Sequence, residues 1–213
     1  MGPSNVTAEQ ITGVILAGGL ARRMGGVDKG LQSFRGQTLI EHALQRLRPQ
    51  VAMIGINANR HHEEYETLGA PVWPDATTDF SGPLSGFLAG MTHSQTPYLV
   101  TVPCDTPDFP TDLVARLASA LENAHADIAM VAAPEQTQPG QMALRTQPVF
   151  CLLKVSLRDS LQHYMQTGGR KIDAWTAQQR TVIVNFDGPT DDASHFFNIN
   201  TLQQLHALEN SSP

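Results

Sequence analysis

Apolar positions along the chain follow two patterns: short continuous runs, and longer segments in which they recur every three or four residues. The continuous runs are typical of buried strands, and the longer spacing is typical of amphipathic helices. The runs lie at 11–16, 51–56, 98–102, 127–132, 148–153 and 181–184. The helical segments lie at 38–47, 61–68, 82–91, 110–122, 157–165 and 201–208. Because strands and helices alternate, we expect an α/β fold with a mostly parallel sheet covered on both faces.

The length and composition of the chain indicate one folded domain. With 213 residues, of which 41% are hydrophobic and 16% charged, the chain can bury a substantial core. We assign residues 1–10 to a flexible leader and residues 11–210 to a single domain. The polar stretch 134–140, PEQTQPG, predicts a loop that divides this domain without separating it into two.

Small and polar residues follow several of the predicted strands. Five separate segments supply them: Gly18-Gly19, Asn57, Asp75, Asp105, and the segment that contains Asn198 and Asn200. In open parallel sheets, ligands bind beyond the carboxyl ends of the strands. We therefore expect all five segments to face one crevice at that edge of the sheet.

The segment 13–30, GVILAGGLARRMGGVDKG, passes from a predicted strand into glycines and then cations. Glycines let main-chain N–H groups approach a phosphate, and Arg23 and Lys29 can add charge-assisted hydrogen bonds. The segment contains neither the G-x-x-x-x-G-K-[ST] loop nor the G-x-G-x-x-G fingerprint. A tight turn with solvated arginines is the alternative, but it gives no role to Arg23, Asp28 and Lys29. We interpret the segment as a polyphosphate-binding loop.

The charge of the chain narrows the class of ligand. The net charge of −6 argues against a general nucleic-acid binder, which needs a broad basic surface to neutralise phosphates. The cluster of Arg22, Arg23 and Lys29 lies within this acidic background. The cluster therefore points to a small anion as the ligand.

Two aspartates and an asparagine at strand ends are candidates for metal and nucleotide binding. Asp105, in the motif PCDTP, suits Mg²⁺, which takes oxygen ligands and often one or two protein carboxylates. The alternative is a turn aspartate before Pro107, and Asp75 carries the same alternative. Asn57 could hydrogen-bond a base or a ribose, or form an Asx turn, for which Asn59 would serve equally well.

The two cysteines, Cys104 and Cys151, are far apart and show no metal-ligand spacing. This usage is typical of a reducing compartment and gives no support to a disulfide framework or a zinc site. No apolar stretch approaches the length of a membrane span, and the polar first residues show no signal-peptide core. We expect a cytoplasmic protein without a membrane partner.

The stretch LAGGLARRMGGVDKGL at 16–31 resembles the signature loop of the molybdenum cofactor guanylyltransferases. LAGG in place of LAAG favours this guanylyl branch over its cytidylyl relatives. Further matches follow in order along the chain: INANRH at 56–61, PD at 74–75, SGPLSG at 81–86, PCDTP at 103–107 and FNINT at 197–201. The resemblance implies a single-domain, Rossmann-like, three-layer α/β/α fold with a mostly parallel mixed sheet, the nucleotide-diphospho-sugar transferase fold. It also implies GTP as substrate and Mg²⁺ as cofactor.

The resemblance assigns roles to the nucleotide side of the site. It implies that GMP passes from GTP to the terminal phosphate of molybdenum-molybdopterin, giving molybdopterin guanine dinucleotide and pyrophosphate. Arg23, Lys29 and Asp105 would be catalytic, with Asp105 holding the metal. The implied nucleotide-binding residues are Leu16, Ala17, Gly18, Gly19, Lys29, Asn57, Asp75 and Asp105. The nucleotide-binding part would span about 11–133.

The acceptor side would lie in the remaining part of the domain, about 141–210. The candidates for holding the pterin phosphate are Gln147, Pro148, Arg170, Lys171, Asn198 and Asn200. Cations at a helix C-terminus, where the helix dipole favours them, are an equal alternative for Arg170 and Lys171. Implied protein partners are molybdenum-insertion proteins and molybdoenzyme-specific chaperones, with no nucleic acid.

Two other functions stay open at this point. One is a related transferase that uses CTP or a sugar phosphate. The other is a carrier that binds GTP or the cofactor without catalysis. The combination of Arg23, Lys29 and Asp105 argues against a carrier, because a carrier needs no metal at the α-phosphate.

Overall fold

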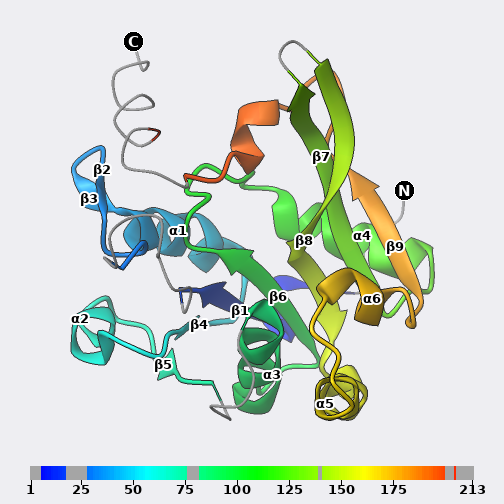
Figure 1. Cartoon of the computed structure of the whole chain (residues 1–213), viewed down its shortest axis with the longest axis horizontal. Helices are drawn as coiled ribbons and strands as arrows, with labels where there is room; N and C mark the ends of the chain where they lie inside the picture. The colour runs from blue at the N-terminus through cyan, green and yellow to red at the C-terminus, as the bar shows by residue number, and fades with distance from the viewer. Residues whose placement is uncertain (1–5, 18–27, 76–81, 139–140, 200–203, 205–213) are drawn as a thin grey trace.

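A computed structural model describes residues 6–17, 28–75, 82–138, 141–199 and 204. In this part of the chain, seven strands form one sheet in the order β5-β4-β1-β6-β8-β7-β9 (Figure 1). The strands are β1 Ile11–Leu16, β4 Met53–Asn57, β5 Val72–Trp73, β6 Tyr98–Pro103, β7 Ile128–Gln138, β8 Gln141–Lys154 and β9 Thr181–Asn185. β8 runs antiparallel to β6 and β7, and the other neighbouring pairs are parallel. The predicted mostly parallel mixed sheet is confirmed.

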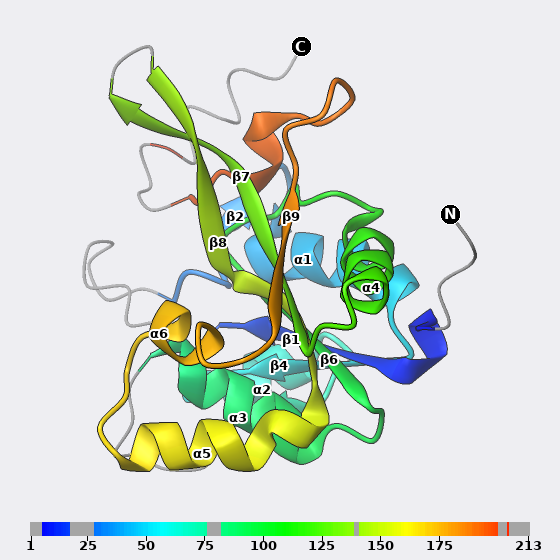
Figure 2. The same ribbon diagram turned by 90° about the vertical axis from the view of Figure 1, so that its right-hand side faces the viewer.

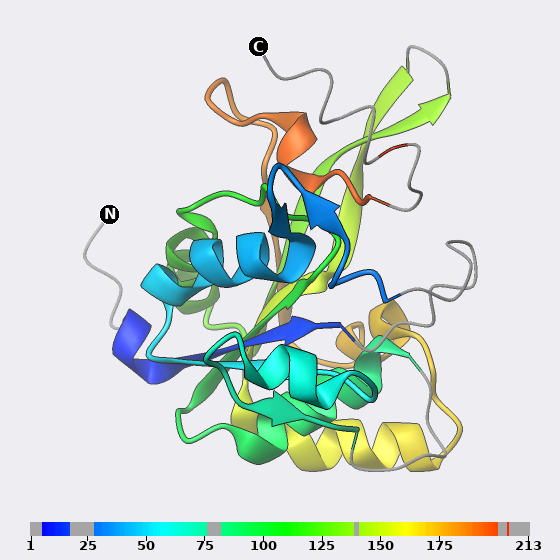
Figure 3. The same ribbon diagram turned by 90° about the vertical axis from the view of Figure 1, so that its left-hand side faces the viewer.

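Helices cover both faces of the sheet (Figures 2 and 3). They are α1 Leu39–Leu47, α2 His62–Glu66, α3 Pro83–His93, α4 Leu113–Asn123, α5 Arg158–Gln166 and α6 Ile172–Thr176. Short 3₁₀ helices occur at Ala8–Gln10, Arg48–Gln50, Val155–Leu157 and Ala193–Phe196, and β2 Ser33–Phe34 pairs with β3 Gln37–Thr38. No helix within the described residues is long and apolar enough to cross a bilayer.

The core lies in two layers, one on each side of the sheet. Ile15 of β1 packs in one cluster with Leu47 of α1 and Leu117 of α4. Val14, its neighbour in the strand, belongs to the other cluster, with side chains from α3, α5 and α6. Because successive residues of a strand point to opposite faces, β1 feeds both layers. The result is the predicted three-layer α/β/α arrangement.

The helix predicted over 38–47 forms as α1, and its start is fixed by side-chain capping. The Oγ1 atom of Thr38 accepts a hydrogen bond from the Glu41 amide, and Glu41 accepts one from the Thr38 amide at 2.7 Å. This reciprocal capping box satisfies main-chain donors that the first turn leaves open. The apolar face from Leu39 to Leu47 is buried, as its spacing predicts.

The prediction of a loop over 134–140 is wrong for residues 134–138. These residues continue β7, which pairs with β8 through Pro134↔Leu144 and Gln136↔Met142. Residues 139 and 140 lie outside the described part. The ladder between the two strands supplies the main-chain hydrogen bonds of this hairpin. Because residues 135–138 are polar and exposed, their sequence alone is typical of a loop.

The start of the chain differs from the prediction in the part that the structure describes. We assigned residues 1–10 to a flexible leader, but Val6 is buried in the core and Ala8–Gln10 forms a 3₁₀ helix directly before β1. Residues 1–5 lie outside the described part, as does the helix predicted at 201–208 apart from Gln204.

Candidate functional site

The carboxyl ends of three central strands lie side by side. Leu16, the last residue of β1, is in register with Asn57 of β4 and with Pro103 of β6. The Ala17 amide donates to the Asn57 carbonyl at 2.9 Å, and the Cys104 amide donates to the Leu16 carbonyl at 3.2 Å. After β1 the chain adds β4 and β5 on one side and then crosses to β6 on the other, so this edge is a topological switch point. Ligands bind at such points in open α/β sheets.

Lys29 and Asp105 meet at this edge. The Nζ atom of Lys29 lies 2.7 Å from Oδ2 of Asp105, although the two residues are 76 positions apart. The side chains are 21% and 17% exposed, so both remain within reach of a ligand. The sequence suggested a phosphate contact for one residue and a metal ligand for the other, and the structure brings them into direct contact.

The backbone around Lys29 is tied to the beginning of α1. The Gln32 amide donates to the Lys29 carbonyl at 3.1 Å, and the Ile40 amide donates to the Gly30 carbonyl at 3.0 Å. These hydrogen bonds fix the point at which the lysine side chain leaves the chain. Lys29 is therefore held by the fold rather than by a free loop.

A second cluster joins the ends of β4 and β5. The Nδ2 atom of Asn57 donates to the Trp73 carbonyl and to Oδ1 of Asp75, both at 2.9 Å. Because an amide group has two N–H donors, this leaves the oxygen of Asn57 as the group it can offer to a ligand. Asn57 is 4% exposed, and a Cβ on Gly86 of α3 would lie 2.5 Å from that oxygen. The glycine lets α3 pack directly against Asn57.

Asn59 belongs to this cluster, although the sequence suggested it only as an alternative Asx-turn residue. Its Nδ2 atom donates to Oδ2 of Asp75 at 2.8 Å, and its Oδ1 atom accepts from the Asp75 amide at 2.8 Å. Both carboxylate oxygens of Asp75 thus accept hydrogen bonds from asparagine side chains. The signal in the sequence was the N-x-N spacing in INANRH, but the pairing depends on where β5 places Asp75.

The C-terminal segment packs against the Asp105 loop. The Ile199 amide donates to the Asp105 carbonyl at 2.8 Å. The Thr106 hydroxyl, which is buried, donates to Oδ1 of Asn198. The predicted proximity of Asn198 to Asp105 is thus present, and Asn198 helps to hold the loop that carries the carboxylate.

Gln147 and Pro148 lie on β8 beside the end of β6. Gln147 pairs with Val131, and the register between β7 and β8 shifts directly after this pair. Proline in a sheet is confined to edges and irregular positions because it lacks an N–H donor, and Pro148 lies at this shift. The buried thiol of Cys151 donates to the Pro148 carbonyl, and the Thr101 hydroxyl donates to the Val149 carbonyl.

The connection between α5 and α6 lies on the same side of the molecule as the tip of β1 (Figure 2). Arg170 in this connection donates to the carbonyls of Met165 and Gly169 at 2.9 and 2.7 Å. These contacts are those of a cation at a helix C-terminus, the alternative that the sequence left open. Lys171 is exposed and precedes the first turn of α6. The other predicted site residues, Gly18, Gly19, Arg23 and Asn200, lie outside the described part.

Within the described residues, no group of three or more His, Cys, Asp and Glu side chains could hold a metal. Cys104 precedes Asp105, and burial raises the pKa of its thiol well above the ordinary value. A thiol that stays protonated is a poor nucleophile, so Cys104 acts as a packing residue.

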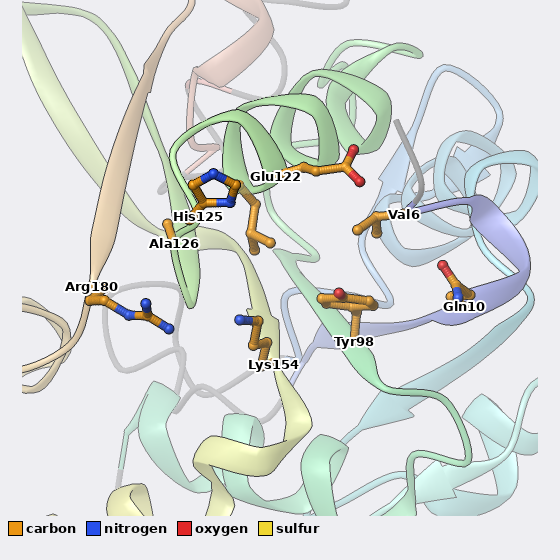
Figure 4. A pocket seen from close by; sticks show the side chains of 9 residues that line it. Val6, Gln10, Tyr98, Glu122, His125, Ala126, Lys154 and Arg180 are labelled. Atoms are coloured by element: carbon orange, nitrogen blue, oxygen red, sulfur yellow. The ribbon is translucent and has the colours of Figure 1, made fainter. Parts of the chain in front are cut away.

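A cavity of about 350 Å³ lies at the opposite edge of the sheet (Figure 4). Its lining includes Tyr98 at the start of β6 and Lys154 at the end of β8. Lys154 and Arg180 both form ion pairs with Asp127, at 2.9 and 2.7 Å. The shared carboxylate ties the residue before β7 to the last residue of β8 and to the residue before β9. The cavity is thus separated from Lys29 and Asp105 by the length of the strands.

Replacing Asp127 with asparagine should lower the free energy of unfolding by about 1 kcal/mol at neutral pH. Hydrogen bonds from Arg180 and then Lys154 hold the pKa of Asp127 at about 2, below its ordinary value of 3.8. Because the folded-state pKa is depressed, the contribution is complete above about pH 5 and is lost as the pH falls from about 4 to 2. Urea titrations of the wild type and of Asp127→Asn at pH 7 and pH 3 measure the difference in the free energy of unfolding. An equal difference at the two pH values would contradict this account.

Comparison with known proteins identifies close relatives. The MobA-like NTP transferase domain family matches residues 13–182. The molybdenum cofactor guanylyltransferase of Albidiferax ferrireducens is 60% identical over 208 residues, covering 97% of this chain and 99% of that protein. The molybdenum cofactor guanylyltransferase of Bordetella pertussis is 54% identical over 204 residues, covering 96% and 99%.

The fold has a counterpart among solved structures. Molybdopterin-guanine dinucleotide biosynthesis protein A from Archaeoglobus fulgidus matches with a TM-score of 0.71 at 23% identity, covering 93% of this chain and 97% of that one. At this identity the likeness concerns the fold alone. It confirms the predicted class, the nucleotide-diphospho-sugar transferase fold.

Proposed function

This chain belongs to the family of the molybdenum cofactor guanylyltransferases, and we propose that it transfers GMP from GTP to molybdenum-molybdopterin. The products are molybdopterin guanine dinucleotide and pyrophosphate. The observation that carries the proposal is the 2.7 Å contact between Lys29 and Asp105 at the switch point of the sheet. A cation and a carboxylate at one point suit a nucleoside triphosphate that binds together with a divalent metal.

The nucleoside would lie beside β1 and β4. The main chain of Leu16, Ala17 and Gly18 and the oxygen of Asn57 would contact the guanine and the ribose. Asp75 holds the Asn57 amide through Oδ1 and so orients the oxygen of Asn57. Hydrogen-bond acceptors suit guanine, whose Watson–Crick edge carries N–H donors.

The triphosphate would lie beside Lys29, Gly19 and Arg23, with Mg²⁺ at Asp105. Asp105 fits this ion because its carboxylate is only partly buried and lies at the strand edge. Mg²⁺, when bound, supplies positive charge to the phosphate oxygens. Lys29 would release Asp105 and turn its ammonium group toward the phosphates, where charge builds up as pyrophosphate leaves.

The attacking group would be the terminal phosphate of the acceptor. A phosphate monoester has a second pKa of about 6 and is largely ionised near neutral pH, so no general base is needed. The protein would act by orienting the two phosphates in line and neutralising charge. Gln147, Pro148, Arg170, Lys171, Asn198 and Asn200 are the residues we propose for the acceptor.

The setting of the reaction follows from the same proposal. Both cysteines are buried free thiols, as suits the reducing cytoplasm in which we place the enzyme. The acceptor would arrive from molybdenum-insertion proteins, and the product would pass to molybdoenzyme-specific chaperones.

Incubation of the protein with molybdopterin, Mg²⁺ and either GTP or CTP tests the function. Mass spectrometry should identify the guanine dinucleotide with GTP, with one pyrophosphate released per product. A cytosine dinucleotide formed at an equal rate would indicate the cytidylyl alternative. Binding of GTP with no product in the presence of the acceptor would indicate a carrier, and either result would overturn the proposal.

A further inference from the structure

Asp28, the residue before Lys29, is a buried carboxylate. It is 6% exposed, and its Oδ1 atom accepts from the Gly30 amide at 3.0 Å and from the Tyr65 hydroxyl at 2.5 Å. Among the described residues, the two groups that donate to Oδ1 of Asp28 are both uncharged. A buried carboxylate needs such donors, and they fix its position. Asp28 is thus held rigidly one residue from Lys29.

The contact from Asp28 to Gly30 makes Lys29 the central residue of a tight turn. A carboxylate that accepts from the amide two residues on forms an Asx turn, which sets the direction of the residue between. The side-chain amide of Gln32 also donates to the Asp28 carbonyl at 2.8 Å. From this turn the Lys29 side chain reaches Asp105.

The second donor to Asp28, the Tyr65 hydroxyl, comes from a different element of the fold. It lies on α2 and is 0% exposed. Burial, more than the nearby Cys104 and Asp28, raises the pKa of its hydroxyl far above neutral, so the hydroxyl stays a donor. A Cβ on Gly30 would lie 2.5 Å from the Tyr65 oxygen, so the turn approaches this hydroxyl as closely as glycine allows.

We propose that Tyr65 is a positioning residue: acting through Asp28, its hydroxyl holds Lys29 in the place from which it contacts the phosphates. The inference rests on the proposed function for the reaction that it serves. Lysine is a point charge on a flexible four-carbon stem, so its aim depends on the backbone that carries it. Without the hydroxyl, Asp28 would move toward water, and the turn would move with it. α2 begins shortly after Asn57 and Asn59, so Tyr65 also links the nucleoside cluster to the phosphate side.

Tyr65→Phe is the test, because it removes one oxygen and keeps the ring. We expect kcat to fall about 10- to 100-fold, since a shift of about 1 Å in a catalytic group costs up to about 100-fold. KM for GTP should change much less than kcat. Asp28→Ala removes the oxygen that accepts from Tyr65 and Gly30, so it should give at least as large a loss, and the double variant should lose little more than Asp28→Ala alone, because the hydroxyl acts through Asp28.

Thr12→Val is the matched control. It removes another buried hydroxyl, which contacts the Thr96 hydroxyl at 2.7 Å, at the far end of β1. It should lower the melting temperature by a similar amount and leave kcat unchanged. A Tyr65→Phe variant with kcat within about twofold of the wild type, or a Thr12→Val variant with an equal loss of kcat, would overturn the proposal.

A crystal structure of Tyr65→Phe gives a second readout that does not depend on which substrate the enzyme uses. The contact between Lys29 and Asp105 should be broken or the turn displaced. An unchanged contact at 2.7 Å would overturn the positioning role. If the wild-type protein formed no guanine dinucleotide, the proposed function would fail, and this comparison would still decide whether Tyr65 positions Lys29.

Discussion

Replacing Lys29 with alanine should lower turnover about 100- to 1,000-fold while the protein keeps its fold, the loss typical for one preorganised charge contact in the transition state. The side chain is partly exposed and contacts a partly exposed aspartate, so the melting temperature should change little. Steady-state kinetics with GTP and molybdopterin, together with circular dichroism, measure both effects. Because the ammonium acts on charge that develops as pyrophosphate leaves, kcat should fall more than the affinity for GTP.

Lys154→Ala is the matched control for this variant. Lys154 is a partly exposed lysine that pairs with Asp127 at 2.9 Å, at the opposite edge of the sheet. Loss of the Lys154 side chain should lower the melting temperature slightly and leave turnover unchanged. Near-normal turnover in Lys29→Ala, or an equal loss in Lys154→Ala, would remove Lys29 from the mechanism.

Replacing Asp105 with asparagine should also lower turnover about 100- to 1,000-fold. The change keeps the shape of the side chain and removes its charge, so it weakens a Mg²⁺ site while leaving the packing of the loop intact. Calorimetry of GTP binding should show that Mg²⁺ tightens binding to the wild type more than to the variant. Without Mg²⁺, the variant should bind GTP at least as well, because a negative charge near the phosphates has gone.

Asp127→Asn provides the comparison for Asp105→Asn. Asp127 also pairs with a lysine, but at the far edge, so its variant should keep normal turnover and a normal response to Mg²⁺. If Asp105→Asn kept near-normal turnover, Asp105 would have no part in the reaction.

The sequence predicted the parts of the fold that carry strong periodic patterns. The strand at Ile11–Leu16 was placed to the residue, because it is buried on both faces and its sequence is almost entirely apolar, apart from Thr12. The arm formed by 134–138 of β7 and 141–147 of β8 was missed because most of its residues are exposed, Met142 and Leu144 included, so no buried apolar face marks it in the sequence. Pairing between the two strands holds the arm together. The short helix α6 was also missed.

The site residues divide in the same way, into those that a local sequence pattern locates and those whose position depends on the fold. Leu16, Asn57 and Asp105 could be located because each follows a predicted strand, and parallel strands end at one edge. Tyr65 could not be located from the sequence, because its role depends on the fold. α2 places the Tyr65 hydroxyl against Asp28, 37 residues earlier in the chain. The motif of Arg170 did not decide between its two roles, because a cation after two glycines suits both a helix C-terminus, whose Met165 carbonyl it contacts, and the acceptor phosphate that we propose.

The most direct test of the central claim is a crystal structure with Mg²⁺ and a non-hydrolysable GTP analogue. The triphosphate should lie within hydrogen-bonding distance of Lys29, with the metal on Asp105 and the nucleoside against the Asn57 oxygen. A nucleotide bound elsewhere, for example in the cavity beside Lys154 and Arg180, would contradict it.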